Sequence, residues 1–103
     1  MTTRVVHLRR EAYDVYIGRA GQGEDGYFGN PFRVGAVCTR CRQLHPDAGS
    51  TLPCYRAYLY ARLSSDSEFY WRVVHLKGKV LGCFCKPGPC HGDVIIEWLE
   101  SWR

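Results

Sequence analysis

The feature that most constrains this chain is its cysteine content, which is high and clustered. Six of the 103 residues are cysteines, three in "CTRCRQLHPDAGSTLPC" and three in "CFCKPGPCH", and each group contains a histidine. The N-terminal sequence lacks the apolar core of a signal peptide, and no stretch has the length of a membrane span. We therefore expect a cytoplasmic protein without a membrane partner, in which closely spaced cysteines bind metal or do chemistry rather than form disulfides.

The first cysteine group has the ligand set of a structural zinc site, with the spacing C-x2-C-x3-H-x8-C. Cys38 and Cys41 in a tight turn place two sulfurs on one side of an ion, and His45 precedes Pro46 in extended chain. Cys54 falls in the first turn of an expected helix, where the helix dipole favours thiolate. Zinc would order a segment that has few apolar side chains. The alternative is that these cysteines and His45 bind nothing.

The second group allows a metal site or an active site. Cys83 and Cys85 are two residues apart and project from the same face of a strand. The rigid turn that follows brings Cys90 and His91 to the start of the last helix, so three sulfurs and an imidazole can converge on a second zinc ion. In the competing interpretation Cys85 or Cys90 is a catalytic nucleophile, with His91 as its base and Asp93 orienting that base.

Two further arrangements of the second group stay open. The cysteines could pack as small apolar side chains while His91 caps the helix. Ligands from both groups could also share one site, because six cysteines and four histidines allow several partitions. If the group is an active site, we expect His91 to serve Cys83 or Cys85 more readily than Cys90, since neighbouring side chains in a helix diverge by about 100°.

Hydrophobic periodicity predicts one small α/β or α+β domain, residues 1–103, with a short central sheet and about three helices. Residues 37–54 form a Cys-rich zinc-binding insertion in this scheme. We expect Thr51 to cap the first helix, and Ser65 with Glu68 to form a capping box for the second. The expected elements are strands at 4–8 and 14–18, helices beginning near 51 and 65, a buried strand at 79–85 and a helix from 90 onward.

The charge pattern is compatible with an anionic partner. The formal net charge is +4, and eleven of the fourteen basic residues are arginine, the bidentate binder of phosphate and carboxylate. The glycine-rich segment "GRAGQGEDGYFGNPF" exposes backbone N–H groups next to a strand end, where α/β domains bind anions. We therefore predict ligand contacts for Arg19 and Asn30. The alternative is a long turn whose glycines only satisfy backbone geometry.

Three motifs in this chain resemble the family named domain of unknown function 4326, which is common in phages and bacteria. They are GR-x-G at Gly18, Arg19 and Gly21, GNPF at 29–32, and C-x-C-x-P-x-x-C-H-G-D at 83–93. The resemblance implies no activity. It does imply that the second cysteine group belongs to the shared core. The first group lies in an insertion, because the family pattern usually runs almost directly from GNPF into the helix at 55–59.

Three hypotheses about function follow. The first is a phage-type domain that uses one or two zinc ions and binds a nucleotide or nucleic-acid-like anion, in the cytoplasm of the bacterial host if phage-encoded. The second is a Cys/His-dependent hydrolase or transferase acting on a nucleotide or base, and its sign would be a metal with an open coordination position. The third is a phage protein that modulates a host protein, with a broad exposed apolar patch and no pocket around Arg19 as its sign.

Overall fold

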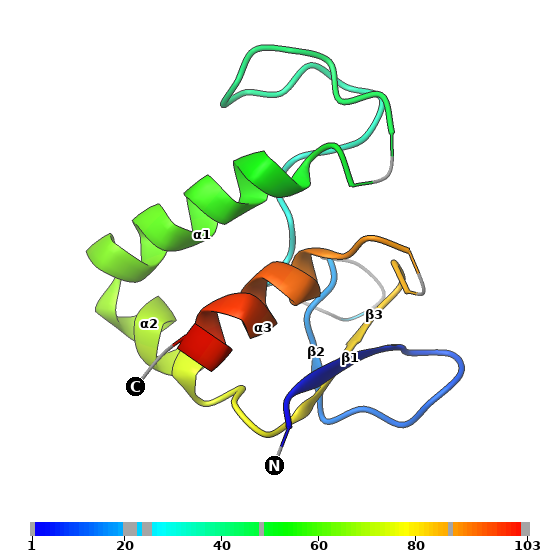
Figure 1. Ribbon diagram of the computed structural model, residues 1–103, viewed down its shortest axis with the longest axis vertical. Helices are drawn as coiled ribbons and strands as arrows, with labels where there is room; N and C mark the ends of the chain where they lie inside the picture. The colour runs from blue at the N-terminus through cyan, green and yellow to red at the C-terminus, as the bar shows by residue number, and fades with distance from the viewer. Residues whose placement is uncertain (1, 20–22, 24–25, 48, 87, 102–103) are drawn as a thin grey trace.

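The computed structural model describes residues 2–19, 23, 26–47, 49–86 and 88–101. Its elements confirm the predicted α+β fold with three helices and one short sheet (Figure 1). In chain order they are β1 (Arg4–His7), β2 (Val15–Tyr16), α1 (Leu52–Ser65), α2 (Ser67–Val74), β3 (Val80–Cys83) and α3 (His91–Ser101). No helix in these ranges has the length and apolar composition needed to cross a membrane.

The last strand in the chain lies at the centre of the sheet. The order is β1-β3-β2, and both outer strands run parallel to β3. In this register Leu81 lies between Val5 and Val15. Parallel neighbours need a long crossover, and here the chain between β2 and β3 supplies it with two helices. The sheet therefore places the C-terminal ends of its strands, which carry the sequence motifs, at one edge.

Helix α3 packs directly on the sheet because Gly92 has no side chain. A Cβ at this position would lie 2.6 Å from Val5 Cγ2 and 2.7 Å from Ile17 Cδ1. Burial of each large apolar side chain in this layer contributes roughly 1.5–3 kcal/mol. The helices supply eight of the buried apolar side chains that form the core: Tyr55, Leu59 and Leu63 from α1, Phe69 and Val73 from α2, and Val94, Ile95 and Leu99 from α3.

The start of α2 differs from the predicted capping box. Asp66 is the N-cap, and its side chain accepts a hydrogen bond from the Phe69 N–H at 3.1 Å. Ser65 instead ends α1, and its hydroxyl donates to the Ala61 carbonyl. The prediction for Ser65 and Glu68 is wrong by one residue, because α1 continues to Ser65 and leaves a single residue to separate the two helices.

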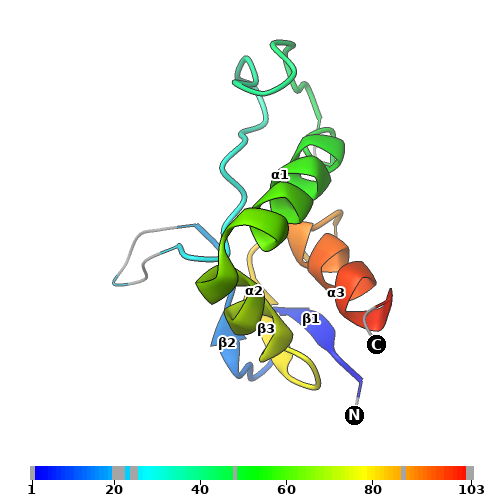
Figure 2. The ribbon, with the colours of Figure 1, turned by 90° about the vertical axis from the view of Figure 1, so that its left-hand side faces the viewer.

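The segment between residues 33 and 51 stands away from the body of the protein (Figures 1 and 2). It carries the first cysteine group and leads into α1. Apart from the cysteines and histidine of that group, the side chains described in 33–47 are exposed. Apolar burial therefore contributes little to the order of this segment.

Candidate functional site

The first cysteine group is built on a short hairpin. Val37 and Leu44 form an isolated antiparallel bridge, and the Cys38 N–H donates to the Gln43 carbonyl at 2.8 Å. The turn closes through the Arg42 N–H, which donates to the Cys38 carbonyl at 2.9 Å with φ of Arg42 at 64°. This turn brings the two ends of the CxxC motif to one side of the hairpin.

All four ligands predicted for the first site come together. One side-chain ligand atom from each of Cys38, Cys41, His45 and Cys54 lies within 4.8 Å of the others. The Cys38 and Cys54 sulfurs are 3.7 Å apart, and the Cys41 sulfur is 3.7 Å from His45 Nε2. A tetrahedral zinc ion with Zn–S bonds of about 2.3 Å would place neighbouring sulfurs about 3.7 Å apart. The group could therefore hold a metal ion with little rearrangement.

The backbone of the hairpin favours a thiolate at Cys38. Burial raises the pKa of this thiol, but the N–H groups of Cys41 and Arg40 donate to its sulfur and lower the pKa to about 6. Burial also raises the pKa of Cys54, and Arg40 Nη1 at 3.7 Å offsets this only in part. Without a metal, Cys38 therefore carries the thiolate, although the sequence suggested that the helix start would favour it at Cys54.

The second cysteine group lies between the end of β3 and the start of α3. The sulfurs of Cys83, Cys85 and Cys90 lie within 4.8 Å of one another. The Cys83 and Cys90 sulfurs are only 2.8 Å apart, so an ion bound here would have to separate them. Hydrogen bonds from Cys85 and Cys90 hold the pKa of Cys83 far below its usual value, while the contact with Cys83 raises the pKa of the other two thiols. The close contact thus favours ionisation of Cys83 over that of Cys85 and Cys90.

His91 lies beside this three-sulfur cluster without joining it. Its Nε2 is 2.6 Å from the Ile17 carbonyl, and because a carbonyl only accepts, Nε2 carries the proton and Nδ1 the lone pair. Burial lowers the pKa of His91, which keeps the ring neutral. Nδ1 is 3.9 Å from the Cys90 sulfur, contrary to the predicted preference for Cys83 or Cys85. The helical divergence assumed there does not apply, since Cys90 precedes α3.

Asp93 contacts the turn before α3 rather than His91. One carboxylate oxygen accepts from Lys86 Nζ at 2.7 Å, and the other accepts from the Cys90 N–H at 3.3 Å. The second contact is the backbone half of a capping box. The group that orients His91 is the Ile17 carbonyl, so Asp93 acts on the helix start and not on the imidazole.

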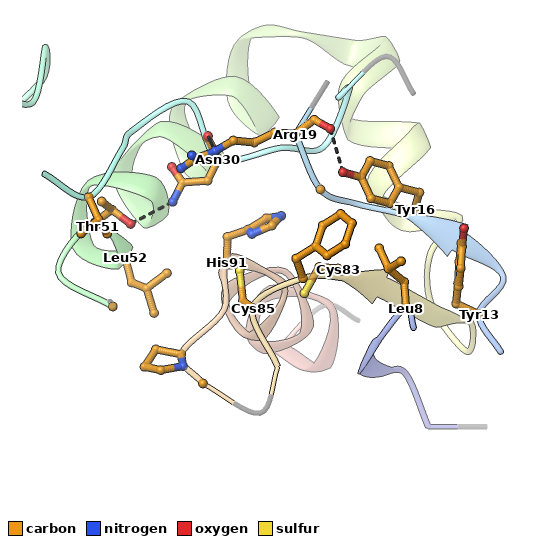
Figure 3. Close-up of a pocket in the computed structure, with 16 residues that line it drawn as sticks. Leu8, Tyr13, Tyr16, Arg19, Asn30, Thr51, Leu52, Cys83, Cys85 and His91 are labelled. Atoms are coloured by element: carbon orange, nitrogen blue, oxygen red, sulfur yellow. Dashed lines mark hydrogen bonds between the residues drawn. The ribbon is translucent and has the colours of Figure 1, made fainter. Parts of the chain in front are cut away.

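A cavity of about 640 Å³ lies against the second cysteine group (Figure 3). Cys83, Cys85 and His91 line one side of it, and Cys85 is exposed. The protruding segment and the start of α1 supply another wall. The remaining described lining comes from Leu8, Tyr13, Tyr16, Gly18, Arg19, Asn30, Val34, Gly49, Thr51, Leu52, Phe84, Gly88 and Pro89. The aromatic lining was not predicted, because it depends on how the strand ends meet.

Arg19 and Asn30, which we predicted to contact a ligand, both line this cavity. Their polar groups form hydrogen bonds with other parts of the protein. Arg19 donates from Nε to the Asn30 carbonyl at 3.1 Å and from Nη2 to the Phe32 carbonyl at 2.6 Å. The Asn30 amide donates to Thr51 Oγ1 at 2.9 Å and accepts from the Phe32 N–H at 2.9 Å. Thr51 consequently makes no side-chain cap for α1, contrary to prediction.

The GR-x-G and GNPF motifs meet at the edge of the cavity. A Cβ on Gly29 would lie 2.8 Å from the Gly18 carbonyl oxygen and 3.1 Å from Arg19 Cα. Two backbone segments pass each other here at a distance that leaves no room for a side chain. Gly21, the last residue of GR-x-G, lies outside the described residues.

Comparison with known proteins agrees with the resemblance seen in the motifs. Over 54 residues the chain is 38% identical to the "Uncharacterized 12.4 kDa protein in nrdA-td intergenic region" of Enterobacteria phage T4. That match covers 50% of this chain and 50% of the phage protein, so the chain spans about half the length of the curated relative it matches. No solved structure matches the chain. A family model matches residues 2–101, and the chain therefore belongs to the family described as Domain of unknown function (DUF4326).

Proposed function

We propose that this domain binds a nucleotide in the 640 Å³ cavity, beside a zinc ion held by Cys83, Cys85 and Cys90. The first cysteine group, Cys38, Cys41, His45 and Cys54, holds another zinc ion, which orders the protruding segment that forms one wall of the cavity. Thiolate-rich ligand sets select soft ions, and three thiolates with one imidazole are typical of structural zinc.

The observation that carries this proposal is the contrast between the two groups. The first supplies four ligands, and Cys38, His45 and Cys54 are buried, so an ion there would be enclosed by protein. The second supplies three sulfurs, of which Cys83 and Cys85 line the cavity. Structural zinc sites are closed, whereas working sites keep a position for water or ligand. The second group has the open arrangement.

The lining of the cavity supports a nucleotide as the ligand. Its volume falls within the range of about 300–1,000 Å³ that is usual for small-molecule sites. Tyr13, Tyr16 and Phe84 line the cavity with aromatic rings, and stacking of a base on such a ring is worth about 1–3 kcal/mol. The arginine-rich composition supplies the positive field that a phosphate group requires.

The open metal position also supports a second function, an enzyme that acts on the bound nucleotide or base as a hydrolase or transferase. An ion held by Cys83, Cys85 and Cys90 would supply Lewis-acid chemistry there, and His91, neutral with its Nδ1 unprotonated, can accept a proton. The cavity argues against modulation of a host protein, because the expected sign of that function was a surface with no pocket around Arg19.

The test compares wild type with Cys85→Ala, which removes an exposed metal-binding sulfur without leaving a cavity in the core. Ser64→Ala, also one exposed heteroatom and outside the cavity, is the matched control. Calorimetric titration with nucleoside monophosphates should show that Cys85→Ala binds at least about tenfold more weakly, as expected for losing one strong contact. Zinc analysis of the same samples should show one ion fewer per chain.

A Cys85→Ala protein that keeps its zinc and its nucleotide affinity would contradict the proposal. Chromatography of the wild-type titration mixtures tests the enzyme hypothesis at the same time. A new product that forms with wild type and not with Cys85→Ala supports it, and unchanged nucleotides in every mixture oppose it.

A further inference from the structure

The structure contains a second cavity, of about 380 Å³, which shares Arg19 and Asn30 with the first. We infer that this second cavity binds a phosphate group through Arg33, Arg62 and the hydroxyl of Tyr58. The phosphate site itself does not depend on a metal. Its use by a nucleotide, with the base in the first cavity and the terminal phosphate in the second, rests on the proposed function.

The described side chains around the second cavity carry more positive than negative charge. Arg19, Arg33 and Arg62 all line it, and no carboxylate is among its described lining residues. Asp66 pairs with Arg62 at 3.6 Å, while Arg33 makes no hydrogen bond or ion pair with any described residue. Clustered guanidinium groups attract anions, and arginine matches the geometry of phosphate oxygens.

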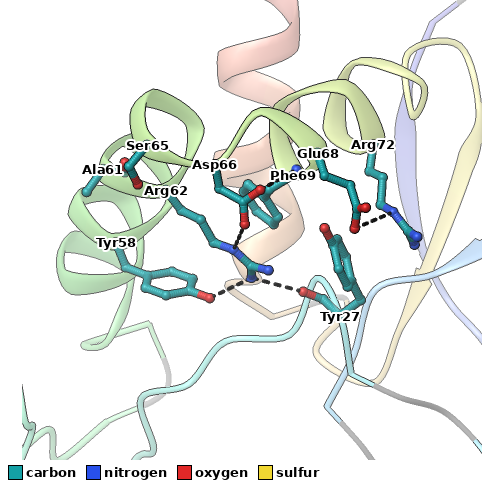
Figure 4. A network of polar contacts seen from close by, with 9 residues as sticks. All are labelled: Tyr27, Tyr58, Ala61, Arg62, Ser65, Asp66, Glu68, Phe69 and Arg72. Carbon is teal, nitrogen blue, oxygen red and sulfur yellow. Dashed lines mark hydrogen bonds and ion pairs between the residues drawn. The ribbon is translucent and has the colours of Figure 1, made fainter.

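Arg62 is held in place before any ligand arrives (Figure 4). Its guanidinium lies over the ring of Phe69 at 4.0 Å and near that of Tyr27 at 4.9 Å. Nη1 donates to the Tyr58 hydroxyl at 2.9 Å, and Nε faces Asp66. Its Nη2 has no hydrogen bond to the described part of the chain. A donor group fixed in this way loses little side-chain entropy when it binds an anion.

Tyr58 adds a neutral donor to the same cavity. Its oxygen accepts the hydrogen bond from Arg62, which leaves the phenolic proton available to donate in another direction. The ring packs edge-on against Phe32 with centroids 6.1 Å apart, and this contact restricts the position of the hydroxyl. A phosphate between Arg33, Arg62 and Tyr58 would receive hydrogen bonds from three side chains.

Arg19 contributes charge to this site more than direct contact. Both Nε and Nη2 donate to backbone carbonyls, so in this inference Arg33, Arg62 and Tyr58 make the direct contacts with phosphate. Inorganic phosphate and the terminal phosphate of a monoester share the chemistry that the site recognises. The two cavities are neighbours, since Arg19 and Asn30 line both of them.

The experiment titrates inorganic phosphate into wild type, Arg33→Ala and Tyr58→Phe at constant ionic strength, and follows binding by NMR. Arg10→Ala is the matched control, since Arg10 is an exposed arginine outside both cavities. Loss of one charge-assisted hydrogen bond should weaken binding about tenfold or more for Arg33→Ala, and loss of a neutral one about threefold for Tyr58→Phe. Arg10→Ala should stay within about twofold of wild type.

Three results would overturn the inference: no phosphate binding by wild type, no effect of Arg33→Ala, or an equal loss in Arg10→Ala.

Titration with a nucleoside, which has no phosphate group, separates this inference from the proposed function. If Arg33→Ala weakens binding of the monophosphate but not of the nucleoside, both stand. If inorganic phosphate binds as described while the nucleoside does not bind at all, only the proposed function fails. A dinucleoside phosphate that binds more tightly than the monophosphate would overturn the assignment to a terminal phosphate.

Discussion

Asn30 and Thr51 form a buried polar contact that joins the GNPF segment to the start of α1. Both residues are buried, and the amide of Asn30 is satisfied by Thr51 Oγ1 and by the Phe32 N–H. A buried donor or acceptor that loses its partner costs about 1–3 kcal/mol. The contact therefore fixes one wall of the cavity whether or not Asn30 also touches a ligand.

We expect Asn30→Ala to lower the free energy of unfolding by about 1–3 kcal/mol, because the Phe32 N–H then loses its buried acceptor. Thr51→Val should lower it by a similar amount, since the Asn30 amide is left without an acceptor. Urea denaturation of each variant measures the effect. Ser50→Ala, which changes an exposed neighbouring contact, is the control and should stay within about 0.5 kcal/mol of wild type. An Asn30→Ala variant as stable as Ser50→Ala would contradict the structural role.

Residue-level prediction from the sequence succeeded where spacing alone determines geometry. Cys38, Cys41 and His45 lie in one short hairpin, so their convergence follows from local chain geometry. The Asn30–Thr51 contact joins residues 21 positions apart, and it depends on how the loop packs on α1. No local pattern in the sequence carries that information.

At the scale of elements, the protruding segment between residues 33 and 51 has little apolar packing of its own. Val34, Val37 and Leu44 are exposed apolar side chains, so the segment buries little surface of its own. Val34 and Gly49 nevertheless line the first cavity. Order in this segment is thus coupled to the shape of the cavity.

Removal of metal should release this segment while the helices and sheet stay folded. We expect amide exchange in peptides from 34–47 to accelerate at least about tenfold after chelation, because the backbone hydrogen bonds of an unanchored hairpin open easily. Hydrogen exchange with mass spectrometry measures this, and peptides from α3 serve as the internal reference. Equal acceleration in α3, or no change in 34–47, would show that the ion does not act locally.

The order and types of the elements were predictable from periodicity, and their ends were less so. The stripe of Tyr55, Leu59 and Leu63 identified α1, and all three are buried. The boundary between α1 and α2 was misplaced because Ser65 and Asp66 are both good capping residues. The parallel strand order with β3 in the centre could not be predicted from the sequence either, since it depends on pairing between distant segments.

At the scale of the whole molecule, we expect two zinc ions per chain with different exchange rates. The enclosed ion of the first group should resist a competing chelator, whereas the ion beside the cavity, with exposed Cys85 as a ligand, should leave within seconds to minutes. A colorimetric chelator assay resolves the two phases, and Cys85→Ala should remove only the fast one. Release in a single phase, or a fast phase that survives in Cys85→Ala, would contradict two separate sites.

The central position of β3 has a consequence for synthesis of the protein on the ribosome. The partners of β1 and β2 are residues 80–83, which are made only after both helices of the crossover. The N-terminal strands therefore leave the ribosome with no strand to pair with, and closing so long a loop is slow. Nascent chains shorter than about four-fifths of the protein should have helices and no sheet, so that the cavity forms last.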